Sequence, residues 1–278
     1  MRNFYLRFPN GKSKLFTISY DDGVDQDVRL ISLMKKYSIK GTFNINSELF
    51  PPEDFCWPQG TIHRRMPVSK LMAAFDTPNV EVAVHGAKHL YPTAVPASVA
   101  MCDFIDDRRN LEKLFGRLIR GAAYPFGRYD QSTLEILKNA GIVYCRTTKS
   151  TKTFELPGNW LELHPTCHHN EPALFELADK FINTAPRYLP YFFYLWGHSY
   201  EFESNDNWDR IESLLGMIAN HEDVWYCTNM EAYEYIEAYN RLVYSADGSV
   251  IYNPTLIDVW VMDNNQILPI PSGKTIHL

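Results

Sequence analysis

Two kinds of segment alternate along the first 240 residues of this 278-residue chain, and their order limits the folds it can adopt. Short, mostly apolar runs typical of buried strands are each followed by a longer stretch with apolar residues at helical spacing. The predicted strands lie at residues 15–20, 41–45, 80–84, 118–124, 142–147, 191–197 and 224–228. The predicted helices lie at residues 27–37, 69–75, 97–115, 131–140, 172–184, 208–220 and 231–239.

Repeated strand-then-helix units favour a parallel sheet with helices against its faces. The pattern therefore predicts an α/β fold in which about seven parallel strands close, or nearly close, into a (β/α) barrel. An open doubly wound sheet is the alternative. No G-x-G-x-x-G follows the first predicted strand, so the sequence does not support a dinucleotide-binding fold.

The pattern changes after Asn240, where short strands and turns replace the helices. Asp247-Gly248 between two apolar runs is a strong hairpin signal. Further strands are predicted at residues 241–244, 249–252, 257–262, 266–270 and 274–278. We therefore expect residues 1–240 to form a barrel domain and residues 241–278 to form a small antiparallel β extension that contributes no chemistry.

Composition excludes several classes of partner. The net charge is -6 and no dense Lys/Arg block occurs, so nucleic acid is not an expected partner. The five cysteines are widely spaced and include no C-x-x-C, which favours a reducing compartment over a disulfide framework. No uninterrupted apolar run approaches the roughly 18 residues of a membrane span, and the first residues lack the apolar core of a signal peptide. The sequence thus predicts a cytoplasmic protein without a membrane partner and leaves its oligomeric state open.

Polar residues with catalytic potential follow two of the predicted strands. Asp21 and Asp22 close the first strand, and His85 and His89 follow the third. One carboxylate and two imidazoles can hold a divalent metal with an open position for water, which leaves the second carboxylate to act as a base. On a helical turn, the four-residue spacing would place both imidazoles on one face. Each pair alone could be a solvated turn or two surface histidines, but their joint position at strand ends favours one site.

Two more features occupy strand ends. Tyr124, Pro125 and Phe126 begin a rigid turn after the fourth strand, and such a turn can aim backbone N–H groups at a developing oxyanion. His198 follows the sixth strand. Because active sites of (β/α) barrels lie at the carboxyl ends of the strands, these residues are expected to share one site with the aspartates and histidines.

These motifs resemble those of the polysaccharide deacetylase family, carbohydrate esterase family 4, in order and spacing over roughly residues 13–240. The family motifs are of the types Thr-Phe-Asp-Asp-Gly, His-Ser/Thr-x-x-His, Arg-x-Pro-Tyr/Phe-Gly and Leu-x-His. The corresponding segments are Ser19-Tyr20-Asp21-Asp22-Gly23, His85-Gly86-Ala87-Lys88-His89, Ala123-Tyr124-Pro125-Phe126-Gly127 and Leu195-Trp196-Gly197-His198. The resemblance implies a distorted barrel with fewer than eight repeats.

The resemblance also implies an activity, the hydrolysis of an acetyl group on a sugar or oligosaccharide, with N-acetyl favoured. Asp21 resembles the base that takes a proton from water at the metal, and His198 resembles the general acid. The backbone N–H of Phe126 resembles the oxyanion donor. Asp22, His85 and His89 resemble the metal triad, which suits Zn²⁺, with Co²⁺, Ni²⁺ or Mn²⁺ as alternatives.

The sequence departs from the family pattern in three places. Ala123 stands where the third motif has the Arg that pairs with the base, Gly86 replaces a hydroxyl residue, and the fourth motif is not recognisable, with Asn159-Trp160 as its nearest match. From its position at the end of the fifth strand, we hypothesise that Arg146 takes over the role of the missing Arg toward Asp21. The residues expected to bind substrate are Tyr124, Pro125, Arg146, Trp160 as a sugar platform, and His168 in a substrate-facing loop.

The altered motifs leave two alternatives to deacetylation. One is hydrolysis of another C–N bond, in a cyclic amide or imide, on the same fold. The other is a catalytically inactive carbohydrate-binding relative, although the presence of Asp21, both metal-site histidines and His198 argues against loss of activity. A cytoplasmic location favours a soluble mono- or oligosaccharide over an intact wall polymer.

Overall fold

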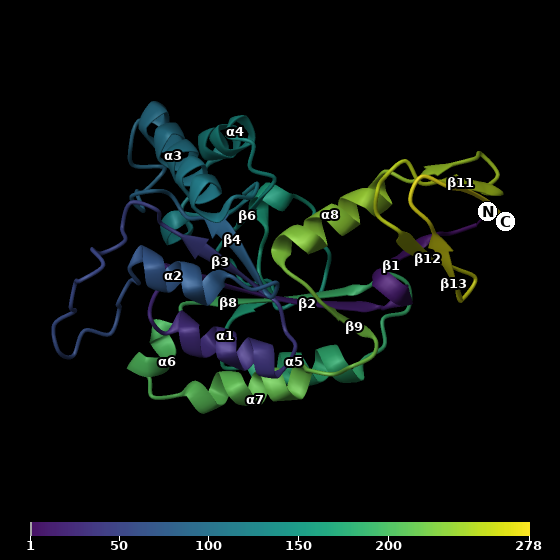
Figure 1. Ribbon diagram of the computed structural model, residues 1–278. Helices are drawn as coiled ribbons and strands as arrows, with labels where there is room; N and C mark the ends of the chain where they lie inside the picture. Colours follow the sequence, from purple (N-terminus) through teal and green to yellow (C-terminus); the bar gives the residue numbers. More distant parts are fainter. Residues whose placement is uncertain (1) are drawn as a thin grey trace.

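The structure is a computed structural model and describes residues 2–278. Its centre is a parallel sheet in the order β6-β5-β4-β3-β2-β8-β7, with β9 paired to β2 (Figure 1). The strands are β2 (Lys14–Asp21), β3 (Gly41–Ile45), β4 (Val80–Val84), β5 (Gly121–Ala123), β6 (Tyr144–Arg146), β7 (Cys167–His168), β8 (Tyr191–Gly197) and β9 (Val224–Tyr226). The predicted (β/α) barrel architecture is confirmed, with an 8-stranded sheet because the two-residue strand β7 adds to those expected.

Strand β2 is the centre of the sheet. One of its edges pairs with β8 along residues 14–20. Its other edge is shared, because β9 pairs with residues 14–16 and β3 with residues 18–21. All residues of β2 are buried. The carboxyl end of β2, which carries the two aspartates, is therefore enclosed by strands on both sides.

Residues 163–168 hydrogen-bond both to β6, at one edge of the sheet, and to β8, near the other edge. The amide of Leu163 donates to the carbonyl of Cys145 in β6 at 3.0 Å, and its carbonyl accepts from Thr147 N at 3.0 Å. Three residues later, Thr166 N donates to the Tyr194 carbonyl in β8 at 2.8 Å, and β7 continues that pairing. The sheet is thus curled so far that a single short segment spans the gap between β6 and β8.

Helices cover the sheet on both sides in Figure 1. They are α1 (Asp27–Lys36), α2 (Val68–Phe75), α3 (Ala97–Phe115), α4 (Gln131–Asn139), α5 (Leu174–Asn183), α6 (Tyr200–Ser204), α7 (Trp208–Ile218) and α8 (Asn229–Asn240). The short helix α6, directly after β8, was not predicted, nor were the 3-10 turns η1 (Pro9–Gly11) and η3 (Trp160–Glu162). A third 3-10 turn, η2 (Pro125–Gly127), lies where the rigid turn after the fourth strand was predicted. Among residues 2–278, no helix combines the length and the apolar character that crossing a bilayer requires.

The C-terminal residues form two small antiparallel sheets. One contains β10 (Val243–Tyr244), β11 (Val250–Tyr252) and β14 (Thr275–His277), and the other contains β12 (Val259–Asp263), β13 (Gln266–Ile270) and the N-terminal strand β1 (Tyr5–Arg7). The hairpin of β10 and β11 is where the Asp247-Gly248 turn predicted it, whereas β1 was not predicted. Figure 1 shows these sheets at the end of the molecule where β2 begins, with both chain termini beside them. The division into domains at residue 240 stays a prediction.

Candidate active site

A cavity of about 570 Å³ opens at the carboxyl ends of the barrel strands. Parallel strands present the side chains that follow them at one edge of the sheet, which explains why residues far apart in sequence meet here. The lining residues are Asp21, Asp22, His63, Arg65, His85, His89, Tyr124, Phe126, Gly127, Arg146, Thr148, Trp196, His198 and Tyr200. The residues that the sequence assigned to the base, the metal and the acid are all among them.

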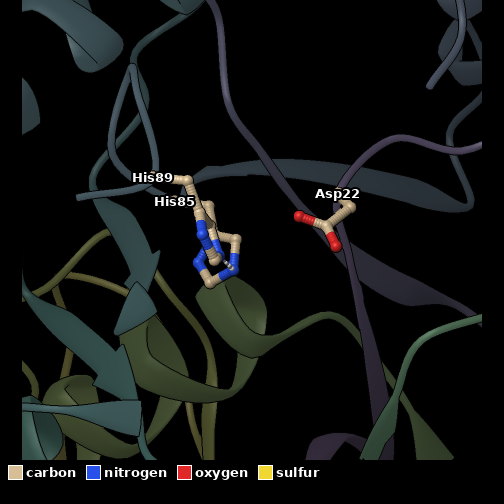
Figure 2. A group of neighbouring side chains, drawn as sticks. All are labelled: Asp22, His85 and His89. Carbon is tan, nitrogen blue, oxygen red and sulfur yellow. Dashed lines mark hydrogen bonds between the residues drawn. The ribbon is translucent and has the colours of Figure 1, made fainter. Parts of the chain in front are cut away.

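Asp22, His85 and His89 form the candidate metal centre (Figure 2). One ligand atom from each lies within 4.8 Å of the others, and the two Nε2 atoms are 3.2 Å apart. His85 Nδ1 donates to the carbonyl of Ala123 at 2.9 Å, which leaves Nε2 with a free lone pair for a cation. Burial lowers the pKa of His85, and burial with the neighbouring His85 lowers that of His89 to about 4. Both imidazoles are therefore neutral, as metal ligands must be, and the donor set fits a divalent cation.

The backbone around these ligands differs from the helical turn expected between the histidines. Residues 86–89 form a tight turn in which His89 N donates to the carbonyl of Gly86 at 3.2 Å. Gly86 and His89 have φ values of 74° and 53°, and Asp22 has 80°. A positive φ is costly for any residue other than glycine, so the surrounding structure must hold Asp22 and His89 in place. A Cβ at Gly86 would lie 2.5 Å from Asp103 Oδ2, which explains the absence of a hydroxyl residue there.

Two residues that the sequence analysis missed contact the carboxylate of Asp22. His63 Nε2 lies 3.0 Å from Oδ2, and Arg65 Nη2 donates to Oδ1 at 2.8 Å. Burial opposes the charge on Asp22, but these two contacts outweigh it and hold its pKa well below the ordinary value. Both residues belong to the long connection between β3 and α2. Asp22 is therefore ionised and already oriented by neighbours on its solvent side.

Asp21 is almost fully buried beside Asp22. Asn44 Nδ2 donates to its Oδ1 at 2.8 Å, while its Oδ2 forms an ion pair with Arg146. The same Oδ2 lies 3.7 Å from His198 Nε2. Burial alone would raise the pKa of Asp21, but the Arg146 guanidinium, with lesser contributions from the nearby imidazoles, lowers it below the ordinary value. A carboxylate that stays charged inside a cavity can accept a proton from a substrate or from water.

The position of Arg146 explains how it reaches Asp21. In the pairing of β5 with β6, Arg146 lies directly beside Ala123, the residue that stands where the third motif has Arg. The guanidinium is buried and its carbon lies 4.3 Å from the centre of the Trp196 ring. The contact that we hypothesised from the sequence is present, with the cation supplied by the neighbouring strand. Its effect on the base stays a prediction.

His198 lies across the cavity with a partner that the sequence analysis missed. Its Nδ1 lies 2.8 Å from Oε1 of Glu201 in α6. Burial alone would lower the pKa of His198, but the Glu201 hydrogen bond, aided by Asp21 and Asp22, raises it above the ordinary value. Glu201 lies three residues after His198, at the start of a short helix, and this spacing could have identified it from the sequence.

The residues expected to bind substrate are only partly at the cavity. Tyr124 and Arg146 line it. Phe126, expected to stabilise the oxyanion, lines it as well, and its exposed ring stacks on Tyr91 with centroids 3.7 Å apart. Pro125 is buried in the turn, and Trp160 and His168 do not line the cavity. Substrate binding by these three residues stays a prediction.

The position of Trp160 has a structural reason. Trp160 packs edge-on against Tyr233 and Phe192, because the chain between β6 and β7 returns to the sheet through Leu163 and places the partly buried indole against a second apolar cluster. Trp160 thus lies outside this cavity, and its role as a sugar platform stays a prediction. Trp196, near the end of β8, lines the cavity although only 9% of it is exposed.

The sequence matches the model of one protein family. The sequence model of that family, described as polysaccharide deacetylase, matches residues 9–145. No curated protein matches the sequence. The chain resembles a Streptococcus pyogenes deacetylase solved in complex with acetate at 20% identity and a TM-score of 0.45, covering 52% of this chain and 61% of that one. It therefore spans less than two thirds of that protein's length.

Two other solved structures cover most of this chain. A proposed polysaccharide deacetylase from Mycobacterium smegmatis is 14% identical with a TM-score of 0.57, covering 86% of this chain and 96% of that one. A carbohydrate esterase family 4 domain of a multidomain xylanase, from the hindgut metagenome of Trinervitermes trinervoides, is 12% identical with a TM-score of 0.52, covering 81% and 92%. At these identities the likeness shows a shared fold.

Proposed function

Because the chain belongs to the polysaccharide deacetylase family, we propose that it is a metal-dependent hydrolase that removes acetyl groups from an acetylated mono- or oligosaccharide. The single observation that carries this proposal is the convergence of Asp21, Asp22, His85, His89 and His198 on one cavity. N-acetylated sugars are the favoured class, and a cytoplasmic location with a soluble substrate is part of the proposal.

Asp22, His85 and His89 would hold the cation, with Zn²⁺ favoured and Co²⁺, Ni²⁺ or Mn²⁺ as alternatives. A bound divalent cation would polarise the acetyl carbonyl and lower the pKa of water in the site. His85 is fixed for this task, since its Nδ1–H donates to Ala123 and only Nε2 faces the cavity. His63 and Arg65 orient Asp22 through contacts to its two carboxylate oxygens.

The chain's own residues supply the proton transfers. Asp21 accepts a proton from the attacking water, and Arg146 keeps that carboxylate ionised until then. The backbone N–H of Phe126 stabilises the oxyanion at the acetyl carbon. His198 donates its Nε2 proton to the leaving nitrogen or oxygen, and its raised pKa keeps that proton available. The products are acetate and a deacetylated sugar.

Acetate release from a panel of N-acetylated and O-acetylated sugars tests the proposal. Metal-loaded wild type is compared with Asp22→Ala, which removes a ligand, and Asp21→Asn, which removes the base. We expect acetate from the wild type alone, loss of metal in Asp22→Ala, and retained metal without turnover in Asp21→Asn. Stoichiometric metal without acetate from any sugar would refute deacetylation. Ring opening of cyclic amides or imides, or sugar binding without turnover, would then identify which alternative holds.

A further inference from the structure

The carboxylate of Glu201 is the centre of a polar cluster behind the cavity. Its Oε1 lies 2.8 Å from His198 Nδ1 and 3.6 Å from His168 Nε2. Its Oε2 accepts from Asn170 Nδ2 at 2.7 Å and lies 3.2 Å from His169 Nε2. Three of these four neighbours are consecutive residues at the end of β7, which we call the 168–170 turn. Burial opposes the charge on Glu201, but His168, His169 and His198 together hold its pKa well below the ordinary value.

The hydrogen-bond directions show that this cluster is not arranged to hold a cation. Asn170 N donates to His168 Nδ1 at 3.1 Å, so a neutral His168 carries its proton on Nε2, toward Glu201. Burial lowers the pKa of His169 to about 4, so this ring is neutral as well and donates from Nε2. A cation needs a free lone pair on each ligand, whereas here each imidazole presents a proton. His168, His198 and Glu201 lie close enough together for a metal, but the two imidazoles direct N–H groups at the Glu201 carboxylate, which accepts from them.

The 168–170 turn is itself held rigidly against the sheet. His169 N donates to the Trp196 carbonyl at 2.9 Å, and Arg210 Nε donates to the His169 carbonyl at 3.0 Å. The His169 ring stacks on Tyr20 at 5.7 Å and 15°. A Cβ at Gly197 would overlap His169 Nδ1, so only glycine at that position lets the ring come this close to β8.

These contacts fix the orientation of His198. A nitrogen that donates to a carboxylate must carry the proton, so the Glu201 contact assigns Nδ1–H and turns Nε2 toward the cavity, 3.7 Å from Asp21 Oδ2. We propose that Glu201 is the positioning residue that orients His198 for proton donation, and that the 168–170 turn holds Glu201 in place. The inference deepens the proposed function and rests on it for the role of His198, whereas the contacts stand without it.

Nuclear magnetic resonance of the imidazole protons tests the contact without any need for activity. Wild type should show a downfield, exchange-protected Nδ1–H resonance that is absent in His198→Gln. Glu201→Gln keeps the size of the side chain but removes its charge, and it should shift this resonance upfield or abolish it. Glu212→Gln is the matched control, since this carboxylate pairs only with the exposed Lys36 on the surface. An unchanged resonance in Glu201→Gln would overturn the proposal.

Kinetics with two leaving groups tests the role. An amine or sugar alkoxide needs a proton to leave, whereas 4-nitrophenolate leaves without one. For an N-acetylated sugar, Glu201→Gln should lower kcat by about 100-fold with KM within about twofold. For 4-nitrophenyl acetate, the same variant should stay within about threefold of wild type. Asn170→Ala should lower kcat for the N-acetylated sugar by a smaller factor and leave 4-nitrophenyl acetate hydrolysis near wild type, because it removes one hydrogen bond to Glu201.

Equal losses for both substrates would show a merely structural role and overturn the proposal, as would a second bound metal ion that Glu201→Gln loses. Metal content measured on every variant distinguishes these results. If wild type releases acetate from neither substrate, the proposed function fails. The resonance of His198 then still decides whether Glu201 fixes its tautomer.

Discussion

The guanidinium of Arg146 forms a buried ion pair with the carboxylate of Asp21, and it reaches that carboxylate from the strand beside the one that carries Ala123. Ala123 and Arg146 are paired in the register of β5 and β6. A side chain on β6 can therefore reach the same part of the cavity as one at position 123 on β5. The second side-chain hydrogen bond to Asp21 comes from the neutral amide of Asn44, so Arg146 supplies the main balancing charge.

Replacing Arg146 with Met should therefore impair both stability and activity. Removing one partner of a buried pair typically costs roughly 3–5 kcal/mol. Since the pair lowers the pKa of Asp21, its stabilisation exists above the unfolded pKa and disappears as pH falls through the folded one. Urea unfolding should thus show a wild-type advantage near neutral pH that shrinks in acid. The acid limb of the pH–rate profile should move to higher pH.

Arg109→Met is the control for this change, because Arg109 is an exposed residue of α3 paired with Asp106. It should alter stability by less than about 0.5 kcal/mol. An Arg146→Met profile that coincides with wild type would show that the ion pair does not tune the base.

The Arg146 contact also shows what local sequence can predict. Strand ends in a parallel sheet share an edge, so the positions of Asp21, His85 and His198 after apolar runs sufficed to place them together. The same reasoning placed Arg146 near the base. It could not assign the register of β5 and β6, which depends on sheet pairing between residues 23 apart and decides that Arg146 replaces the side chain missing at Ala123.

The rate of acetate release should fall as pH rises through the pKa of His198. The protonated form is the donor, and Glu201 raises this pKa despite burial. The groups facing the ring are Glu201, Asp21, Tyr200 and Trp196, of which the two carboxylates are its charged neighbours. Glu201→Gln should therefore move the descending limb to lower pH, while Glu212→Gln leaves it in place. A descending limb at the same pH in both variants would contradict this assignment.

Metal removal should destabilise the protein without unfolding it. The apolar core clusters do not depend on the metal centre, whose ligands lie at strand ends. A cation present at 100 times its Kd adds about 2.7 kcal/mol to the folded state. A chelator should thus lower Tm by several degrees in wild type and have no effect in Asp22→Ala. Asp25→Asn, which changes a carboxylate paired with Arg64 and Lys70 outside the cavity, should respond as wild type does. Equal chelator effects in wild type and Asp22→Ala would place the metal elsewhere.

The residues that sequence reasoning missed share a physical cause. His63 and Arg65 belong to a connection without regular structure, and ion pairs such as Arg64 with Glu203 of α6 fix its path. No local periodicity encodes such long-range contacts. The position of Trp160 outside the cavity has a related cause, since the chain after β6 returns to bridge the sheet through Leu163. In contrast, Glu201 could have been identified from its spacing, because it lies three residues after His198. It was missed because helix α6 has only five residues and shows no clear helical periodicity.

Gly86 provides a test of how tightly the turn between the metal-site histidines is built. Gly86→Ala introduces a Cβ 2.5 Å from Asp103 Oδ2 at a φ of +74°, and Asp103 Oδ1 also accepts from Lys88 N at 2.8 Å. The variant should lose roughly 2–4 kcal/mol, from a strained backbone and a displaced carboxylate. Metal affinity should fall with it, because the same turn carries His89.

Gly60→Ala is the matched control for backbone strain alone. Gly60 has a φ of +85°, but no atom lies within 4 Å of the position its Cβ would take. It should lose only about 1 kcal/mol and retain full metal affinity. The difference between the two variants, measured by urea unfolding and by metal titration, isolates the contact with Asp103. If both variants lost the same stability and bound metal equally well, the Asp103 carboxylate would have no part in shaping the metal centre.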